Sequence, residues 1–382
     1  RSGSVVPESG AFGKPSRRVD RPGIFCYKGA MIVEQFLPAF HYGDAVSNTA
    51  LAIDRFLRAQ GIGSRLVTLT CDETMREQAV LFGDYRVDPA SIKILHFAIP
   101  SPLTGFFQDQ RCRKVMFFHN ITPARFFPSY SDFFVRFVSA GREHLSLLAR
   151  SFDLAIGVSE YNASELRELG YANVRTFPLI VNLEDYAAPA SRPYLELLHN
   201  ERKNILFVGR VIPNKKIEDL VRVLFYYKKY VSPAIRLIVM GNTRALPKYF
   251  HAVSDLAARF YLTADDLLFT GHLPQDEFLA VYRSADVFLS MSEHEGFCLP
   301  LLESCCFGLP LLAYDAGAVA ETLDGAGILF RDKDPARVAG LVERVLEDGE
   351  LNRKLRAQGA PRIERYRRQA DPALLLDWLR RL

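Results

Sequence analysis

The sequence predicts an α/β protein with two doubly wound, Rossmann-like domains, each built on a parallel sheet. Short apolar runs alternate with longer amphipathic stretches along most of the 382 residues, in two series separated by a polar stretch with two prolines. Strands that alternate with helices indicate parallel sheets covered by helices on both faces. The length also exceeds that of one ordinary domain and fits two domains of roughly 150–200 residues.

The first series follows residues 1–22, which are rich in Gly, Ser, Pro and Arg and which we expect to form a flexible arm. We predict that residues 23–181 form the N-terminal domain. Its expected strands are 24–27, 65–70, 92–97, 114–118, 153–158 and 174–178. Its expected helices are 45–60, 131–150 and 160–169, which show helical spacing of apolar residues.

The second series begins at residue 204, and we predict a linker over 182–203, a C-terminal domain over 204–365 and a C-terminal helix within 366–382 that can pack back on the first domain. The expected strands are 204–209, 235–241, 267–270, 286–290 and 310–314. The expected helices are 215–229, 249–261, 275–284, 299–307 and 336–348. Ligands of open parallel sheets lie beyond the carboxyl ends of the strands, so the two sheets should face a central cleft.

Composition favours a water-soluble, cytoplasmic protein. Charged residues make up 24% of the chain, and no apolar run approaches the ~20 residues that a membrane-spanning helix needs. The six cysteines show neither a CxxC pair nor zinc-ligand spacing, so we expect free thiols in a reducing compartment. Basic residues gather in 1–22 and 351–382, either as solvated ends, which we favour, or as a contact with an anionic membrane surface.

The segment 286–323 carries the strongest indication of a ligand site. A strand leads through a loop into a helix that starts near Pro300, and Gly296 allows the loop backbone to turn tightly and lie close to a ligand. Unpaired N–H groups at the positive end of such a helix suit a diphosphate. These N–H groups belong to Phe297, Cys298 and Leu299.

Two carboxylates, Glu295 and Glu303, flank the start of the same helix, and we expect both to line one pocket. A carboxylate beside a diphosphate is unfavourable unless it accepts hydrogen bonds from hydroxyl groups. Because sugar and ribose hydroxyls are natural donors, the pair favours a nucleotide sugar over a bare nucleotide.

Two cations, Arg210 and Lys215, follow the strand 204–209 in a loop that precedes a helix. A planar guanidinium and a compact ammonium five residues apart suit a diphosphate. They would neutralise the charge of a leaving nucleoside diphosphate without a metal ion, and we expect no metal site. Solvated loop charges are the alternative interpretation for these two residues.

In the N-terminal half, His119 stands just past the strand 114–118, at the edge where the ligand is expected, and His96 holds a similar position. A lone histidine in such a place is more often structural. Gly43 and Asp44 precede the helix 45–60. They either form a loop over the donor phosphates and acceptor, or Asp44 is a plain helix N-cap, and both interpretations remain open.

The run EGFCLPLLE at 295–303 resembles the E-x7-E motif of retaining GT-B glycosyltransferases, specifically glycosyltransferase family 4 (GT4). The match continues through Gly308, Pro310, Asp315, Gly317 and Glu321. The run 206–219 resembles the phosphate clamp of that family, although Lys216 stands where the family usually has Gly. The run 38–49 resembles its glycine loop with Gly43 as the one glycine.

The run HNITP at 119–123 resembles a GT4 subgroup that includes bacterial polysaccharide mannosyltransferases. The resemblance implies that Glu295 approaches the donor sugar, Glu303 binds the ribose and His119 lies near the donor sugar. It also implies retaining transfer of a hexose, with GDP-mannose as first choice of donor and UDP-sugars close behind. The acceptor would be a glycan or a lipid-linked hydroxyl in polysaccharide or lipopolysaccharide biosynthesis, and no cofactor is expected.

The alternatives to a glycosyltransferase are other enzymes and a non-catalytic binding protein. A GT-B phosphorylase or epimerase and a non-catalytic nucleotide-sugar-binding protein remain alternatives, whereas a redox Rossmann enzyme is disfavoured because no G-x-G-x-x-G follows the first strand. The Phe-rich stretch 125–150 predicts either a helix on the membrane surface, at the inner face, or a core helix with a loop lid, which we favour.

Overall fold

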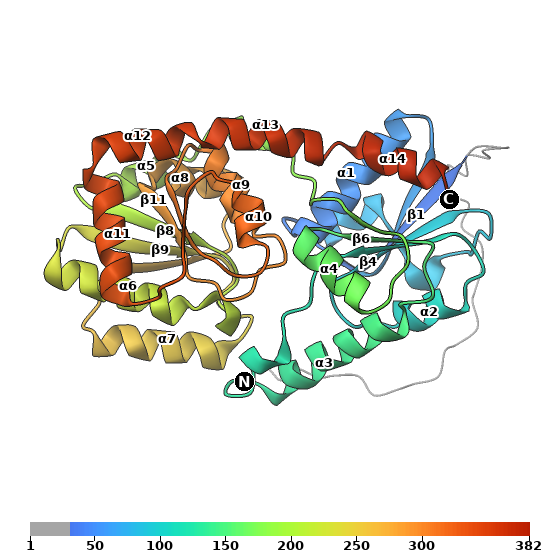
Figure 1. Cartoon of the computed structure of the whole chain (residues 1–382), viewed down its shortest axis with the longest axis horizontal. Helices are drawn as coiled ribbons and strands as arrows, with labels where there is room; N and C mark the ends of the chain where they lie inside the picture. The colour runs from blue at the N-terminus through green and yellow to red at the C-terminus, as the bar shows by residue number, and fades with distance from the viewer. Residues whose placement is uncertain (1–30) are drawn as a thin grey trace. The chain divides into compact units, whose positions relative to one another are not determined.

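The computed structural model describes residues 31–382 and contains two parallel sheets (Figure 1). The strand order is β3-β2-β1-β4-β5-β6-β7 in the first sheet and β10-β9-β8-β11-β12-β13 in the second. The predicted fold class, two Rossmann-like parallel sheets in a GT-B arrangement of the chain, is confirmed. The predicted arm 1–22 and the predicted strand 24–27 lie outside the described residues.

The strands of the first sheet are β1 (Ile32–Phe40), β2 (Gly63–Cys71), β3 (Val80–Leu81), β4 (Ile92–Phe97), β5 (Lys114–Phe118), β6 (Leu154–Gly157) and β7 (Val174–Thr176). Those of the second are β8 (Lys203–Val208), β9 (Ile235–Met240), β10 (Leu267–Gly271), β11 (Val287–Ser290), β12 (Leu311–Tyr314) and β13 (Ile328–Phe330).

Most helices lie between successive strands, and α11 to α14 follow the last strand. Up to the second sheet they are α1 (Ala45–Ala59), α2 (Leu103–Asp109), α3 (Asp132–Leu147), α4 (Glu160–Glu168) and α5 (Arg192–Leu198). From there on they are α6 (Ile217–Tyr230), α7 (Pro247–Arg259), α8 (Gln275–Ser284), α9 (Leu299–Cys306), α10 (Val319–Leu323), α11 (Pro335–Glu347), α12 (Gly349–Ala357), α13 (Gly359–Gln369) and α14 (Pro372–Arg380). Short 3₁₀ helices include η3 (Ala124–Phe126), η4 (Leu183–Ala187) and η5 (Pro213–Lys215).

Most residues of the central strands are apolar because both faces of each sheet are buried. In β5, Val115 and Phe117 belong to one buried cluster, whereas Met116 and Phe118 belong to another. Successive side chains of a strand point to opposite faces, so a strand covered on both sides needs an unbroken apolar run. That run is the signal by which the sequence located these strands.

One strand of the first sheet was not predicted from the sequence. Among the described residues the first strand is β1, which the sequence interpretation did not propose because Glu34, Gln35 and Pro38 interrupt its apolar character. Glu34 is fully buried and paired with the equally buried Lys93 at 3.2 Å. Pro38 is tolerated because β4 pairs only with residues 33–36 of β1, so the missing N–H falls beyond that ladder.

The segment predicted as a linker, 182–203, contains the short helices η4 and α5, and α5 packs against α8. Helix α13 runs through the expected boundary at 365–366. Helix α14 contacts α1, and the Trp378 ring lies edge-on to Phe177 with centroids 6.0 Å apart. The division of the chain into domains stays a prediction.

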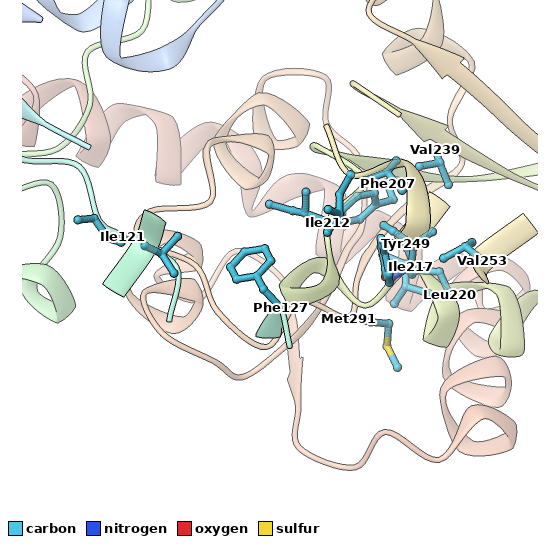
Figure 2. Packing of buried hydrophobic residues seen from close by; sticks show 14 of the residues in the cluster. Ile121, Phe127, Phe207, Ile212, Ile217, Leu220, Val239, Tyr249, Val253 and Met291 are labelled. Carbon is cyan, nitrogen blue, oxygen red and sulfur yellow. The ribbon is translucent and has the colours of Figure 1, made fainter. Parts of the chain in front are cut away.

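The chain after β5 reaches elements of the second sheet. Ile121 and Phe127 belong to the same buried cluster as Ile212 and Tyr249, part of which Figure 2 shows. The ring of Tyr130 meets that of Tyr249 on α7 edge-on, with centroids 5.1 Å apart. The residues between β5 and α3 therefore connect the two sheets.

The Phe-rich stretch 125–150 forms η3 and α3. Phe127 is buried, whereas Phe133 and Leu147 on α3 are 61% and 64% exposed. Both interpretations of this stretch therefore remain predictions. Within residues 31–382, no helix combines the length and the apolar character that crossing a bilayer requires.

The cysteines that the structure describes, Cys71, Cys112, Cys298, Cys305 and Cys306, are all free. The sixth, Cys26, lies outside the described residues.

Candidate active site

Two segments 80 residues apart meet in an ion pair between Lys215 and Glu295. The Lys215 Nζ lies 2.7 Å from Oε1 and 2.6 Å from Oε2 of Glu295. Lys215 follows β8 and Glu295 follows β11, and these strands are neighbours in the second sheet. The carboxyl ends of parallel strands share one edge, so their loops must lie together. The side chains are 16% and 7% exposed, which makes this a largely buried pair.

The two adjacent lysines of this loop have different partners. Lys216 Nζ lies 3.3 Å from Glu293 and 3.7 Å from Glu218, so Lys215 is the lysine that contacts Glu295. Lys216 has a φ of 53°, in the left-handed region that glycine adopts most easily. This backbone conformation is a physical reason for glycine at the position, where this chain has Lys216 instead.

Arg210 lies two residues after β8 and its side chain is exposed. Among residues 31–382 it makes no ion pair or side-chain hydrogen bond. The structure therefore does not bring Arg210 to the Lys215–Glu295 pair, and its role as a second phosphate ligand stays a prediction.

Helix α9 begins directly after this loop. Its N-cap, Cys298, has a φ of 66°, and Pro300 lies in the first turn. Within the described chain, the N–H groups of Phe297 and Cys298 donate no hydrogen bond, and that of Leu299 is one of the N–H groups that a helix start leaves free. Burial raises the pKa of the Cys298 thiol well above its usual range, so the thiol is uncharged.

The loop before α10 contacts the backbone of Glu295 and fixes its position. Ala318 N donates to Glu295 O at 2.9 Å. Gly317 has a φ of 58°, and a Cβ there would lie 2.4 Å from Glu295 O. A side chain at position 317 would therefore displace the backbone that carries the Glu295 carboxylate.

Glu303 is buried on α9, and each of its carboxylate oxygens accepts a hydrogen bond from a tyrosine. Tyr282 Oη donates to one at 2.5 Å, and Tyr186 Oη donates to the other at 2.9 Å. Burial raises the pKa of Glu303, while the two tyrosine hydrogen bonds oppose the rise. Each carboxylate oxygen can accept a second hydrogen bond, so a ribose hydroxyl at Glu303 need not displace either tyrosine. Sequence reasoning missed both tyrosines because nothing in the pattern around them indicates this contact.

Gly296 lies against a residue that follows a strand of the first sheet, and its approach to a ligand stays a prediction. A Cβ on Gly296 would lie 2.4 Å from the Cβ of Asn120, which follows β5 and has a φ of 78°. The space beside Gly296 is thus taken by a side chain that follows a strand of the first sheet. Asn120 also accepts a hydrogen bond from His294 Nε2 at 2.8 Å and donates to Asn162 at 2.6 Å.

Sequence reasoning named neither Asn120 nor His294. The signal for Asn120 was its place in the HNITP run beside His119. His294 is buried, and desolvation, aided by the charges of Arg142 and Lys215, lowers its pKa to about 3. The imidazole is therefore neutral, and its hydrogen bond to Asn120 joins the loops that follow β5 and β11.

Glu321 on α10 makes a second connection. Its carboxylate accepts from the N–H of Glu160 at 2.6 and 2.9 Å and from the N–H of Tyr161 at 3.3 Å. These N–H groups lie at the start of α4, where the helix dipole favours a negative charge. The sequence match at Glu321 thus has a structural explanation, which is capping of a helix attached to the first sheet.

His119 and His96 lie together at the carboxyl edge of the first sheet. His96 Nδ1 and His119 Nε2 are 2.9 Å apart. Burial lowers the pKa of His96 to about 3, and burial together with His96 lowers the pKa of His119 well below its usual range. Both rings are neutral. Within the described residues no hydrogen bond joins His119 to Lys215 or Glu295.

Asp44 is the N-cap of α1, because its carboxylate accepts from the N–H of Ser47 at 3.0 Å. Gly43 has a φ of 75°, and a Cβ there would lie 3.3 Å from the ring of His272, which follows β10. The loop before α1 therefore reaches the second sheet. A role for either residue with donor phosphates stays a prediction.

Across residues 31–382, no group of three or more His, Cys, Asp or Glu side chains has an arrangement that could hold a metal ion.

Residues 196–362 match the family described as "Glycosyl transferases group 1". Over 242 residues the chain is 22% identical to the serotype-specific mannosyltransferase WbdA of Escherichia coli, covering 63% of this chain and 29% of WbdA. It is 29% identical over 208 residues to a GDP-mannose-dependent alpha-mannosyltransferase of Mycobacterium tuberculosis, covering 52% and 50%. The chain thus spans less than a third of WbdA and about half of the mycobacterial protein.

Solved structures share the fold. Anabaena HepE in complex with UDP-glucose matches with a TM-score of 0.71 at 14% identity, covering 92% of this chain and all of HepE. WaaG, a glycosyltransferase involved in lipopolysaccharide biosynthesis, matches with a TM-score of 0.66 at 15% identity, covering 89% and 95%. At such identities these matches bear on the fold alone.

The buried neutral histidines predict a loss of stability in acid. An unfolded histidine has a pKa near 6.5, so protons bind the unfolded chain before the folded one. The contribution of His294 should be complete above about pH 6.5 and should be lost as the pH falls toward 3. Its slope approaches about 1.4 kcal/mol per pH unit. Urea unfolding at several pH values between 7.5 and 4.5 measures this.

The matched variants are His294→Gln, which removes the buried imidazole, and His251→Gln, which removes an exposed one. We expect the pH slope of the unfolding free energy to decrease only in the first variant. Equal slopes in wild type and His294→Gln would contradict the neutral, buried state of His294.

Proposed function

Because this chain belongs to the GT4 family of GT-B glycosyltransferases, we propose that it transfers a hexose from a nucleotide-diphosphate sugar to a hydroxyl of a glycan or lipid-linked acceptor. We propose further that the transfer retains the anomeric configuration and needs no metal ion. The observation that carries this proposal is the Lys215–Glu295 pair, which places a cation suited to phosphate 2.6–2.7 Å from an acceptor suited to sugar hydroxyls.

The start of α9 supports the placement of the diphosphate. The free N–H groups of Phe297, Cys298 and Leu299 and the positive end of the helix favour a doubly charged group close to Lys215. Arg210 is exposed and unpaired among residues 31–382, so it is available as a second cation. We assign Glu295 to the sugar hydroxyls and Glu303 to the ribose.

In the proposed reaction, the bond between the anomeric carbon and the phosphate oxygen breaks, and the nucleoside diphosphate leaves with the electron pair. Lys215 and Arg210 neutralise the developing negative charge, which is the main electrophilic task. The acceptor hydroxyl attacks from the face that the leaving group departs, and its proton passes to the leaving phosphate oxygen. No carboxylate pair of the glycosidase type is required.

The donor is the least constrained part of the proposal. GDP-mannose is our first choice because the relatives include mannosyltransferases and one is named as GDP-mannose-dependent. UDP-sugars follow closely as the second choice. The setting we propose is polysaccharide or lipopolysaccharide synthesis in the cytoplasm. The exposed Phe133 and Leu147 support a peripheral contact with the inner membrane face.

We expect GDP-mannose to raise the thermal unfolding temperature more than GDP-glucose, UDP-glucose or ADP-glucose at equal concentration. A ligand that binds only the folded state stabilises it by about 2.7 kcal/mol at a hundredfold excess over its dissociation constant. Differential scanning fluorimetry measures the shift. A larger shift with UDP-glucose would overturn the choice of GDP-mannose. Binding of a sugar nucleotide with neither transfer of the sugar nor release of the nucleotide would favour the non-catalytic alternative.

Replacing the buried ammonium by Lys215→Ala should lower kcat by roughly 10²–10³, as removal of one preorganised charge-stabilising group does. The matched control is Lys216→Gly, which removes the neighbouring ammonium at a position where φ is 53° and should leave kcat within about threefold. Circular dichroism checks that both variants fold. Wild-type turnover in Lys215→Ala would remove the phosphate role from this residue.

Transfer should continue in excess EDTA at an undiminished rate, because Lys215 and Arg210 supply the charge that a divalent ion would otherwise provide. Initial rates with and without chelator, and after addition of Mn²⁺, test this. Activity that disappears in EDTA and returns with Mn²⁺ would contradict metal independence but not glycosyl transfer.

A further inference from the structure

Two fully buried side chains and one partly buried side chain form a hydrogen-bonded chain across neighbouring strands of the first sheet. Gln35 lies in β1, His96 in the adjacent β4, and His119 directly after β5. Gln35 Oε1 and His96 Nε2 are 2.9 Å apart, and His96 Nδ1 and His119 Nε2 are 2.9 Å apart. Gln35 and His96 are completely buried. We call this chain the Gln35–His96–His119 relay.

The direction of the relay is fixed at its Gln35 end. Gln35 Nε2 donates to the backbone oxygen of Ala50 at 3.0 Å. A carbonyl oxygen can only accept, so the amide must present its NH₂ group to Ala50 and its oxygen to His96. His96 must then donate from Nε2, because the oxygen that it meets has no proton to give.

The direction passes from ring to ring because the rings are neutral. Burial lowers the pKa of His96 to about 3 and that of His119 well below its usual range, so each ring carries one proton. With its proton on Nε2, His96 offers a lone pair at Nδ1, and His119 must donate to it from Nε2. The lone pair of His119 therefore lies at Nδ1.

His119 Nδ1 is the last atom of the relay. His119 Nδ1 is buried and has no hydrogen-bond partner among residues 31–382. Phe117 packs against both imidazoles, with ring centroids 5.3 Å from His96 and 5.0 Å from His119, and offers no polar group. A buried acceptor without a donor is unfavourable, so a donor group of a ligand at this nitrogen would remove that cost.

We propose that Gln35 and His96 are positioning residues that hold His119 as its Nε2–H tautomer, so that Nδ1 accepts a hydrogen bond from a hydroxyl group of the bound sugar substrate. This rests on the proposed glycosyl transfer. A hydroxyl can donate, whereas a phosphate or carbonyl oxygen would place one lone pair against another. His119 in this state supplies no proton to the leaving phosphate from Nδ1, and its part in the reaction is to orient the sugar.

The tautomer can be observed without activity. Two-bond ¹⁵N–¹H correlation spectra of the histidine-labelled full chain distinguish Nε2–H from Nδ1–H rings, and the His119→Gln and His96→Gln variants assign the signals. We expect Nε2–H for both His96 and His119 at pH 7.5. An Nδ1–H signal for His119 would overturn the relay whether or not the protein transfers sugar.

The Gln35→Met variant removes the acceptor for His96 while keeping the side-chain volume. His96 then loses the group that fixes its proton, so His119 should show both tautomers. We expect kcat/KM for the sugar donor to fall on the order of 10-fold, because one neutral hydrogen bond to the sugar is lost in part of the molecules.

The matched control is Val33→Ala, which damages the same strand two residues away, on the same face of the sheet. This variant should keep the Nε2–H tautomer of His119 and a kcat/KM within about threefold of wild type. If Gln35→Met keeps the tautomer, or loses no more activity than Val33→Ala, the positioning role is refuted. If the wild type shows the Nε2–H tautomer but no transfer from any sugar nucleotide, the assignment of a sugar hydroxyl to Nδ1 fails and the tautomer stands.

Discussion

The structure of the candidate site depends on one buried ion pair, that between Lys215 and Glu295. Two opposite charges taken out of water stabilise the protein only when their geometry is good, and either one alone would be strongly destabilising. The loops after β8 and β11 must therefore hold both groups at hydrogen-bonding distance. Gly317 and Ala318 fix the Glu295 backbone from one side. In the proposed function, a bound diphosphate would accept from Lys215 and a sugar hydroxyl would donate to Glu295, so that both groups keep a hydrogen-bond partner.

The contacts between the two sheets lie at the same carboxyl edge as this pair. Asn120 meets Gly296 and His294, Glu321 caps the start of α4, and Gly43 approaches His272. Each contact joins a loop that follows or precedes a strand to an element attached to the other sheet. Two of the residues in these contacts, His294 and Gly296, are the immediate sequence neighbours of Glu295. Substitutions at these contacts would affect the site and the connection at once.

Sequence reasoning succeeded where a signal is local. The central strands were located because both faces are buried, and Lys215 and Glu295 were found because each follows such a strand. It failed for β1, where Glu34 and Gln35 break the apolar run yet are buried against Lys93 and His96. Tyr186 and Tyr282 were missed for a related reason, since their contact with Glu303 joins residues more than 20 positions apart. Roles that depend on tertiary neighbours leave no mark in a local pattern.

The distribution of charge separates two kinds of group at this edge. His96, His119 and His294 are neutral because protonation would bury a positive charge, in the case of His294 near that of Lys215. Lys215 and, on the exposed side, Arg210 are the cations that we propose for the phosphate groups. In the proposed reaction, these cations face the negative charge that develops on the leaving diphosphate, whereas neutral nitrogen and carboxylate acceptors remain for hydroxyl groups. The position of the proton on a neutral imidazole depends on its hydrogen-bond partners. Under our proposal, a residue as remote as Gln35 therefore decides whether His119 Nδ1 accepts or donates a hydrogen bond.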